Sequence, residues 1–266
     1  MGSLIKVAVA GAYGKMGREV MKGVLKADDM LLVGATDIVG HGLDVGSVVG
    51  LELQGITITG NLEEIFRANE VDVLIDFTNV KAVMRNSILA IDYGVSPIVG
   101  TTGLTQAELE QLHSLCEQKQ IGAIVAPNFA LGAILLMQFA KEAAKHFPDI
   151  EIIELHHDGK MDAPSGTAIS TAQAILEERG NRKQGHPNEF EKISGARGAQ
   201  LHGIPIHSVR LPGFIAHEEV IFGGLGQTLT IRHDSTSRES FIPGVLFAAR
   251  QVKKLKKAVF GLDKII

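Results

Sequence analysis

The chain has 266 residues, 45% of them hydrophobic, and its 26 basic and 30 acidic residues give a formal net charge of −4. This composition is typical of a globular protein with one large or two small domains, and it provides no basic field for nucleic acid or an anionic membrane. Cys116 is the only cysteine, which excludes an intramolecular disulfide and fits a reducing compartment. The first apolar run, Ile5–Ala10, is too short for a signal peptide, and no run reaches the roughly 18 apolar residues of a membrane span, so we expect a cytoplasmic protein.

The first half of the chain alternates short β-rich runs with helical patterns, as in βαβ units around a parallel sheet. The predicted strands are Lys6–Ala10, Leu31–Thr36, Thr57–Thr59, Val71–Phe77, Pro97–Val99 and Ala123–Ala126. The predicted helices between them are Gly14–Ala27, Leu62–Ala68, Ala82–Tyr93 and Gln106–Lys119. This order predicts an α/β domain of the Rossmann type, which binds dinucleotides.

The pattern changes after Asn128. The helix Gly132–His146 and the strand Glu151–His156 are predicted first. A polar loop then leads to a second predicted helix, Gly166–Arg179. Alternating runs that suggest antiparallel strands follow a charged, glycine-rich loop, at His207–Leu211, Glu218–Phe222 and Thr228–His233. A last helical pattern, Ser240–Lys256, has no sheet of its own to cover, so we expect it to pack on the first domain.

These elements predict two domains. Residues 1–127 and 238–266 form the dinucleotide-binding domain, and residues 128–237 form a substrate-binding α+β domain with a mixed or antiparallel sheet.

A glycine-rich turn stands between the first strand and the first helix, with the sequence Gly11-Ala12-Tyr13-Gly14-Lys15-Met16-Gly17. Glycines let the backbone turn tightly and approach a pyrophosphate, whose charge is stabilised at the start of a helix. The spacing is GxxGxxG rather than GxGxxG and is a weak signal by itself. Asp37 follows the second strand, where a carboxylate accepts hydrogen bonds from an adenosine ribose; the alternative is a turn or helix-capping residue.

Polar residues also follow two further strands, at Asp76-Phe77-Thr78 and Gly100-Thr101-Thr102-Gly103. Open α/β sheets bind ligands at the carboxyl ends of their strands, so together these segments outline a cleft, although each is also compatible with ordinary turn chemistry. Ile38 provides no cation for a 2′-phosphate beside Asp37, while Lys15 is a possible substitute. We therefore expect NADH to serve at least as well as NADPH.

The segment from Glu154 to Ala168 is the most informative in the chain. It carries His156, His157 and Lys160, and Ser165 is placed to cap the following helix. Imidazole titrates near neutrality, and a helix start beside a lysine is a site for a carboxylate. A metal site is the less favoured alternative because adjacent strand residues point to opposite faces, and we predict none. The other alternative is that this segment is a surface loop without a functional role, in which Lys160 is a solvated charge.

These segments carry a resemblance. Gly11–Gly17, Gly100–Gly103, Ala126–Phe129 and the run ELHHDGKMDAPSGTA resemble the 4-hydroxy-tetrahydrodipicolinate reductase family, formerly dihydrodipicolinate reductase, of lysine and diaminopimelate biosynthesis. The similarity covers nearly the whole chain, including His207–Pro212 and Arg238–Phe241. The run from His156 to Ala168 is highly specific, whereas the Rossmann glycines are not.

The resemblance implies a role for individual residues. The cofactor is expected to be lined by Gly11, Ala12, Tyr13, Gly14, Lys15, Met16, Asp37, Gly100, Thr101, Thr102, Ala126, Pro127, Asn128 and Phe129, with Phe77, Arg238 and Phe241 as neighbours. His156 is the expected proton donor or acceptor, and Lys160 a second proton donor that also holds substrate. The substrate carboxylates are assigned to His157, Gly166 and Thr167, with Thr102 close by. Ile38 and Asn79 depart from some members, which carry arginine there, and this places a strong NADPH preference in doubt.

The implied reaction is hydride transfer from NADH or NADPH to a cyclic dicarboxylate, giving tetrahydrodipicolinate, in a homotetramer assembled through the sheet of the second domain. Two alternatives stay open from the residues alone. One is another two-domain amino-acid dehydrogenase, which would need a different catalytic loop. The other is a non-catalytic dinucleotide sensor, which would have no need for a proton donor such as His156 or Lys160.

Overall fold

The computed structural model describes residues 3–266, and these residues form two compact units. The first unit ends at Phe129 and is completed by Phe241–Ile266, while the second comprises Ala130–Ser240. Each unit has its own sheet. The chain therefore leaves the first unit once and returns to it at the end.

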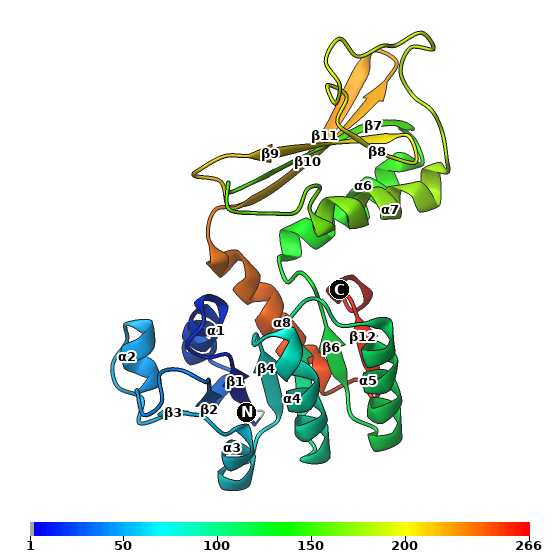
Figure 1. Cartoon of the computed structure of the whole chain (residues 1–266). Coiled ribbons are helices and arrows are strands. Elements are labelled where there is room, and N and C mark those ends of the chain that lie inside the picture. The colour runs from blue at the N-terminus through cyan, green and yellow to red at the C-terminus, as the bar shows by residue number, and fades with distance from the viewer. Residues whose placement is uncertain (1–2) are drawn as a thin grey trace. The chain divides into compact units, whose positions relative to one another are not determined.

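The first unit contains a seven-stranded sheet in which every pair of neighbouring strands is parallel, as predicted (Figure 1). Its order is β12-β6-β5-β4-β1-β2-β3. The strands are β1 (Ile5–Ala10), β2 (Met30–Thr36), β3 (Ile58–Thr59), β4 (Val73–Asp76), β5 (Ser96–Val99), β6 (Ala123–Val125) and β12 (Ala258–Phe260). Because all run the same way, their carboxyl ends share one edge, where open sheets bind ligands.

Helices cover both faces of this sheet (Figure 1). They are α1 (Lys15–Lys26), α2 (Val45–Val49), α3 (Leu62–Ala68), α4 (Val80–Asp92), α5 (Gln106–Lys119) and α8 (Ile242–Val252). Apolar residues of α3, α4 and α5 pack on one face, against Ala8, Leu74, Val99 and Val125 among others. Helices α1 and α8 contact the strands from the other side, so the strands are buried on both faces and read as continuous apolar runs.

The second unit is an α+β structure with a five-stranded mixed sheet in the order β11-β10-β7-β9-β8. Its strands are β7 (Asp149–His156), β8 (Ala199–Leu201), β9 (Ile204–Arg210), β10 (Ala216–Gly224) and β11 (Gln227–Ser235). Helices α6 (Leu131–Ala144) and α7 (Gly166–Arg179) lie side by side on one face of this sheet (Figure 1). Their apolar residues form one core with alternate residues of β7 and β10, such as Ile152 and Val220.

Two details differ from the predictions. The strand over β9 pairs parallel with β7, so only part of the second sheet is antiparallel. The last helix ends at Val252, and the chain then adds β12 to the first sheet beside β6, a strand that its short length concealed. At the end of this helix, Arg250 pairs with Asp29 and Lys253 pairs with Asp72, both of which lie early in the first unit.

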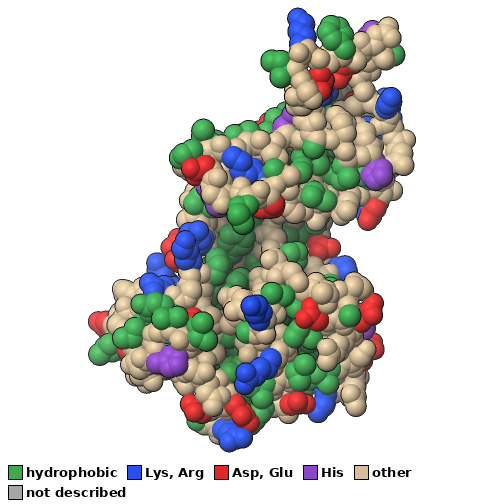
Figure 2. All heavy atoms as spheres, in the orientation of Figure 1, with side chains coloured by type: hydrophobic (Ala, Val, Ile, Leu, Met, Phe, Trp, Pro, Cys, Tyr) green, Lys and Arg blue, Asp and Glu red, His purple; other side chains and the backbone are tan. Residues whose placement is uncertain are grey.

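Charged side chains of both signs are interspersed on the faces shown in Figure 2, in keeping with the small net charge. Over residues 3–266, no helix combines the length and apolar character needed to cross a membrane.

Candidate functional site

The backbone of the β1–α1 turn, residues 11–14, is packed so closely against neighbouring backbone that a side chain in place of its first glycine would not fit. Gly11 has φ of +76°, and a Cβ there would lie 2.6 Å from the backbone oxygen of Phe77. A Cβ on Gly17 would lie 2.0 Å from the backbone oxygen of Gly11, so this glycine lets α1 approach the turn. Gly14 caps α1 without a side-chain hydrogen bond. The first amides of α1 are thus left for an anion, as a pyrophosphate would require.

Asp37 lies beside this turn, at the end of β2. Its Oδ2 accepts a hydrogen bond from the amide of Tyr13 at 2.8 Å, and its Oδ1 accepts one from the amide of Val39 at 3.1 Å. A carboxylate has about four acceptor positions, so two remain for a ribose diol. The turn interpretation and the ribose interpretation of Asp37 are therefore compatible.

Arg18 is a cation at this end that the sequence interpretation did not include. Its Nε donates to the carbonyl of Tyr13 at 3.0 Å, and its guanidinium lies 4.2 Å from the centre of the Tyr13 ring. Its position one helical turn after Gly14 is the sequence feature that could have predicted a cation beside the turn. Ile38, by contrast, is 88% exposed and adds no charge, while Asn79 caps α4 by accepting from the amide of Lys81.

Phe77 links the next segments along the carboxyl edge of the sheet. Its ring lies so close to Gly100 that a Cβ there would sit 2.2 Å from a ring carbon. On another side the ring packs against Phe129, with 5.8 Å between ring centres. Gly244 of α8 packs in turn against the carbonyl of Phe129, which places Phe241 at the nearby start of that helix. The structure thus brings together the predicted cofactor segments after β1, β4, β5 and β6.

Asp76, at the end of β4, is a buried carboxyl that stabilises this edge. Burial raises its pKa, while hydrogen bonds from Thr78 and Asn86 oppose that rise. The Thr78 amide and hydroxyl both donate to Oδ1, and the Asn86 amide donates to Oδ2. Asp76 therefore shapes the loop that follows β4 rather than facing a ligand.

The second unit carries the histidine loop predicted from the sequence. His156 is the last residue of β7, and its Nδ1 lies 2.5 Å from Oε2 of the fully buried Glu154. Arg210, at the end of the neighbouring strand β9, donates two hydrogen bonds of 2.8 Å to the same carboxylate. Burial by itself would raise the pKa of Glu154, but hydrogen bonds from His156 and Arg210 outweigh it and lower the pKa to about 2.

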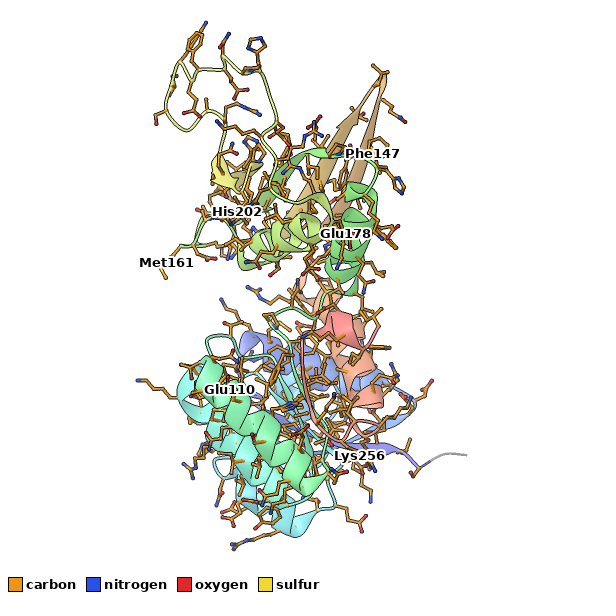
Figure 3. The ribbon with its side chains drawn as sticks, turned by 90° about the vertical axis from the view of Figure 1, so that its right-hand side faces the viewer. Glu110, Phe147, Met161, Glu178, His202 and Lys256 are labelled. Atoms are coloured by element: carbon orange, nitrogen blue, oxygen red, sulfur yellow. The ribbon has the colours of Figure 1, made fainter. Side chains whose placement is uncertain are left out.

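Lys160 lies on the β7–α7 loop, residues 157–164. Its amide donates to the carbonyl of His157 at 3.1 Å, and its Nζ lies 2.7 and 2.8 Å from the two carboxylate oxygens of Asp162. The ammonium lowers the pKa of Asp162. Met161, between them, is fully exposed and projects from the loop (Figure 3). Lys160 is therefore already paired with the exposed Asp162, and a ligand carboxylate would have to replace Asp162 as its partner.

The loop ends at α7, whose start has the expected cap. The Ser165 hydroxyl accepts from the amide of Ala168 at 3.2 Å, as predicted. Gly166 and Thr167 form the first positions of the helix, where the dipole favours a carboxylate, and nothing lies within 4 Å of a Cβ built on Gly166. Within residues 3–266, no three His, Cys, Asp or Glu side chains are grouped to hold a metal ion.

Glu218 is a second buried carboxyl next to Glu154. The two residues face each other in the register between β10 and β7, and Glu218 is only 4% exposed. Neither of its oxygens accepts a hydrogen bond of good geometry, although the hydroxyl of Thr171 on α7 lies close enough to oppose the effect of burial. Burial, together with the charge of Glu154, raises the pKa of Glu218 to about 7, against a smaller opposing effect of Thr171.

The structure thus collects the predicted residues into two groups, one in each unit. His156, His157, Lys160, Gly166 and Thr167 share one loop and helix start. Thr102 belongs to the first unit and Arg238 to the second, so the substrate contact of the former and the cofactor contact of the latter stay predictions. Sequence reasoning did not identify Glu154 and Arg210, whose pairing depends on the register of β7 with β9.

A doubly wound sheet with a glycine turn at its carboxyl edge, followed by an α+β unit, is the architecture of Rossmann-type oxidoreductases. Distant solved structures share the fold: an amine dehydrogenase from Mycobacterium smegmatis has a TM-score of 0.69 at 14% identity, covering 97% of this chain and 95% of that one.

Comparison with closer proteins defines the family. Residues 5–129 match the family described as dihydrodipicolinate reductase, N-terminus, and residues 132–266 match dihydrodipicolinate reductase, C-terminus. A 4-hydroxy-tetrahydrodipicolinate reductase from Desulfitobacterium hafniense is 54% identical over 263 residues, covering 98% of each chain. A dipicolinate-bound dihydrodipicolinate reductase from Paenisporosarcina sp. TG-14 is 48% identical with a TM-score of 0.89, covering 99% of this chain and 100% of that one. This chain belongs to the dihydrodipicolinate reductase family.

Proposed function

We propose that this protein reduces 4-hydroxy-tetrahydrodipicolinate to tetrahydrodipicolinate with NADH or NADPH, in lysine and diaminopimelate biosynthesis. The observation that carries the proposal is the β7–α7 loop, where His156 and Lys160 stand beside an open helix start. The relatives that are about half identical over the full chain carry this activity in their names. An amino-acid dehydrogenase of similar plan would need a different catalytic loop.

The first unit fits a nicotinamide dinucleotide. The β1–α1 turn offers uncapped helix amides to the pyrophosphate, and Asp37 offers acceptors to the adenosine ribose. The remaining predicted contacts are the segments around Phe77, Gly100–Thr102 and Ala126–Phe129. When bound, the reduced nicotinamide would supply a hydride to the conjugated carbon–nitrogen system that the substrate gains when its 4-hydroxyl group leaves as water.

The second unit fits the dicarboxylate. Gly166 and Thr167 at the start of α7, together with His157, bind one carboxylate, and Lys160 exchanges Asp162 for the ligand. Orienting the ring in this way lowers the activation barrier by on the order of 7 kcal/mol. His156 delivers a proton to the carbon next to the one that receives hydride, and Lys160 is a second donor, so the charge left by hydride addition is quenched.

Cofactor choice follows from the residues around Asp37. Ile38 provides no cation for a 2′-phosphate, whereas Arg18 and Lys15 lie on the first turn of α1. We propose that NADH is used at least as well as NADPH. Arg18 is engaged with Tyr13, so its charge favours NADPH less than an arginine at position 38 would.

The assembly is proposed to be a homotetramer in the cytoplasm. Both helices of the second unit pack on the same face of its sheet, which leaves the other face available for contacts between copies. Partly buried apolar residues such as Ile153 and Ile221 line that other face. Light scattering should give the mass of four chains, and the mass of one chain would reject this arrangement.

The activity is tested by following reduced nicotinamide absorbance with the substrate generated in situ by the preceding synthase. Oxidation of NADH or NADPH is expected only when that synthase and its substrates are present. A chain that instead reduced NAD with an amino acid would be the alternative dehydrogenase. A chain that bound NADH without turning over either substrate would be a dinucleotide sensor.

A further inference from the structure

The buried carboxylate of Glu154 is the point at which the β7–α7 loop is joined to the sheet. Its Oε2 contacts His156 Nδ1 at 2.5 Å, and its Oε1 accepts from the amide of Ser165 at 3.1 Å. The guanidinium of Arg210 bridges both oxygens at 2.8 Å each. Residues on either side of the loop therefore converge on one side chain.

These contacts determine which ring nitrogen of His156 carries a fixed proton. The low pKa of Glu154, about 2, means that the group is ionised at neutral pH, and an ionised carboxylate can only accept hydrogen bonds. A 2.5 Å contact with Nδ1 then requires the hydrogen to be on Nδ1. Nε2 is left as the nitrogen that gains and loses a proton.

The same carboxylate fixes the course of the loop. Arg210, held by Glu154, also donates to the carbonyl of Asp162 at 2.7 Å. The next residue, Leu211, donates its amide to the carbonyl of His156 at 3.0 Å. A single ion pair between the buried Glu154 and the partly buried Arg210 thus positions the proton donor and the segment after Lys160. Glu154 also positions the start of α7, because Ser165 precedes the first residue of that helix.

We propose that Glu154 is a positioning residue: it holds the proton on Nδ1 of His156, presents Nε2 to the substrate and, through Arg210, anchors the loop that bears Lys160. This inference rests on the proposed function, since it assigns the nitrogen through which His156 acts. Glu154 itself has no contact with the reacting atoms, because it is completely buried below the loop.

The chain contains a matched control for this cluster. Glu151, on the same strand, accepts from His207 Nε2 at 2.6 Å and from Arg197 at 2.6 Å. It has the same Glu–His–Arg chemistry but lies an odd number of residues from Glu154, on the opposite face of the sheet and away from α7. Glu151→Gln therefore removes an equivalent ion cluster without touching the β7–α7 loop.

The first test measures the tautomer in the unmodified protein. In the full chain with ¹⁵N-labelled histidine, with the His156 signals assigned from the spectrum of His156→Asn, the neutral ring should carry its hydrogen on Nδ1. A neutral ring with the hydrogen on Nε2 would overturn the proposal. This measurement does not depend on whether a Glu154 variant folds.

The second test compares kinetics. Glu154→Gln should lower kcat by at least about 100-fold, as expected when a catalytic imidazole loses the group that sets its tautomer. The dissociation constant of NADH should stay within about twofold. Glu151 lies on the sheet face proposed for contacts between copies, so Glu151→Gln is compared with the parent protein as the same oligomer, checked by light scattering, and should keep its kcat. A Glu154→Gln variant with undiminished kcat would contradict the proposal. If instead His156→Asn turned over normally, the assigned role of His156 would fail, while the tautomer measurement would still decide what Glu154 does.

Discussion

The β1–α1 turn of the first unit and the β7–α7 loop of the second prepare for their ligands by different means. In the turn, backbone groups form the ligand site, and the decisive feature is the absence of side chains at Gly11 and Gly17. In the loop, the decisive feature is a set of charged side chains, in which the buried Glu154 bonds to both His156 and the partly buried Arg210. The turn should therefore be damaged by adding atoms, and the loop by removing a charge or a proton.

The largest effect is expected at the proton donor. His156→Gln should reduce kcat by about 10²- to 10⁴-fold, the usual contribution of a positioned acid, because glutamine occupies similar space without a transferable proton. Steady-state kinetics measure this, and the affinity for NADH, from fluorescence titration, should stay unchanged. An equal loss of NADH affinity would show that His156 serves the cofactor instead.

The buried carboxyl beside Glu154 gives the next effect, on stability. The pKa of Glu218 is raised from 4.5 to about 7 in the folded chain, so the folded state holds its proton more tightly than the unfolded state. The resulting stability is complete below pH 4.5 and is lost as the pH rises through about 7, a change of roughly 3 kcal/mol.

Glu218→Gln removes this titration. Chemical denaturation at pH 5 and pH 8 should show that the variant gains stability relative to the parent protein as the pH rises. His233, opposite Glu218 on β11, is half-buried, and burial lowers its pKa. It is common to both proteins, so its own titration cancels when the two are compared. A constant difference between the two proteins would mean that Glu218 has a partner for its charge.

The glycine turn is tested by adding one methyl group. Gly11→Ala should weaken NADH binding at least about tenfold, because its Cβ would overlap the backbone of Phe77 in addition to the cost of a positive φ. Gly94→Ala is the matched control, since Gly94 has φ of +77° and open space around it. The two variants should share a modest drop in melting temperature. Equal NADH affinities in the two variants would show that the close approach of Gly11 to Phe77 is not needed for NADH binding.

The smallest effect is expected in cofactor preference. Ile38→Arg places a cation beside Asp37 and should raise the ratio of kcat/KM for NADPH over NADH by about tenfold. Leu53→Arg, at another exposed position of the same unit, controls for the added charge. An unchanged ratio in Ile38→Arg would show that this position does not read the 2′-phosphate.

The features predictable from the sequence were those set by neighbouring residues. The cap at Ser165 and the turn at Gly11 depend on neighbouring residues. Most strands of the first sheet were predictable because they are apolar runs between helical patterns. Strand β12 was missed because three residues carry no periodicity and depend on β6 for their pairing.

The charge network of the second unit could not be predicted for a similar reason. Glu154 and Arg210 are 56 positions apart and meet only through the parallel register of β7 with β9. Glu218 faces Glu154 only through the antiparallel register of β10 with β7. Sequence patterns gave the residue types of the loop, while the sheet determined which of them are partners.

The central claim, reduction of a cyclic dicarboxylate by hydride from a nicotinamide, is tested most directly by isotope transfer. With NADH deuterated at the transferable position of the nicotinamide and the substrate made in situ, mass spectrometry should find one deuterium on carbon in tetrahydrodipicolinate. The same label should be absent from the product when His156→Gln is assayed over an equal time. Oxidation of the cofactor without deuterium in this product would contradict the account.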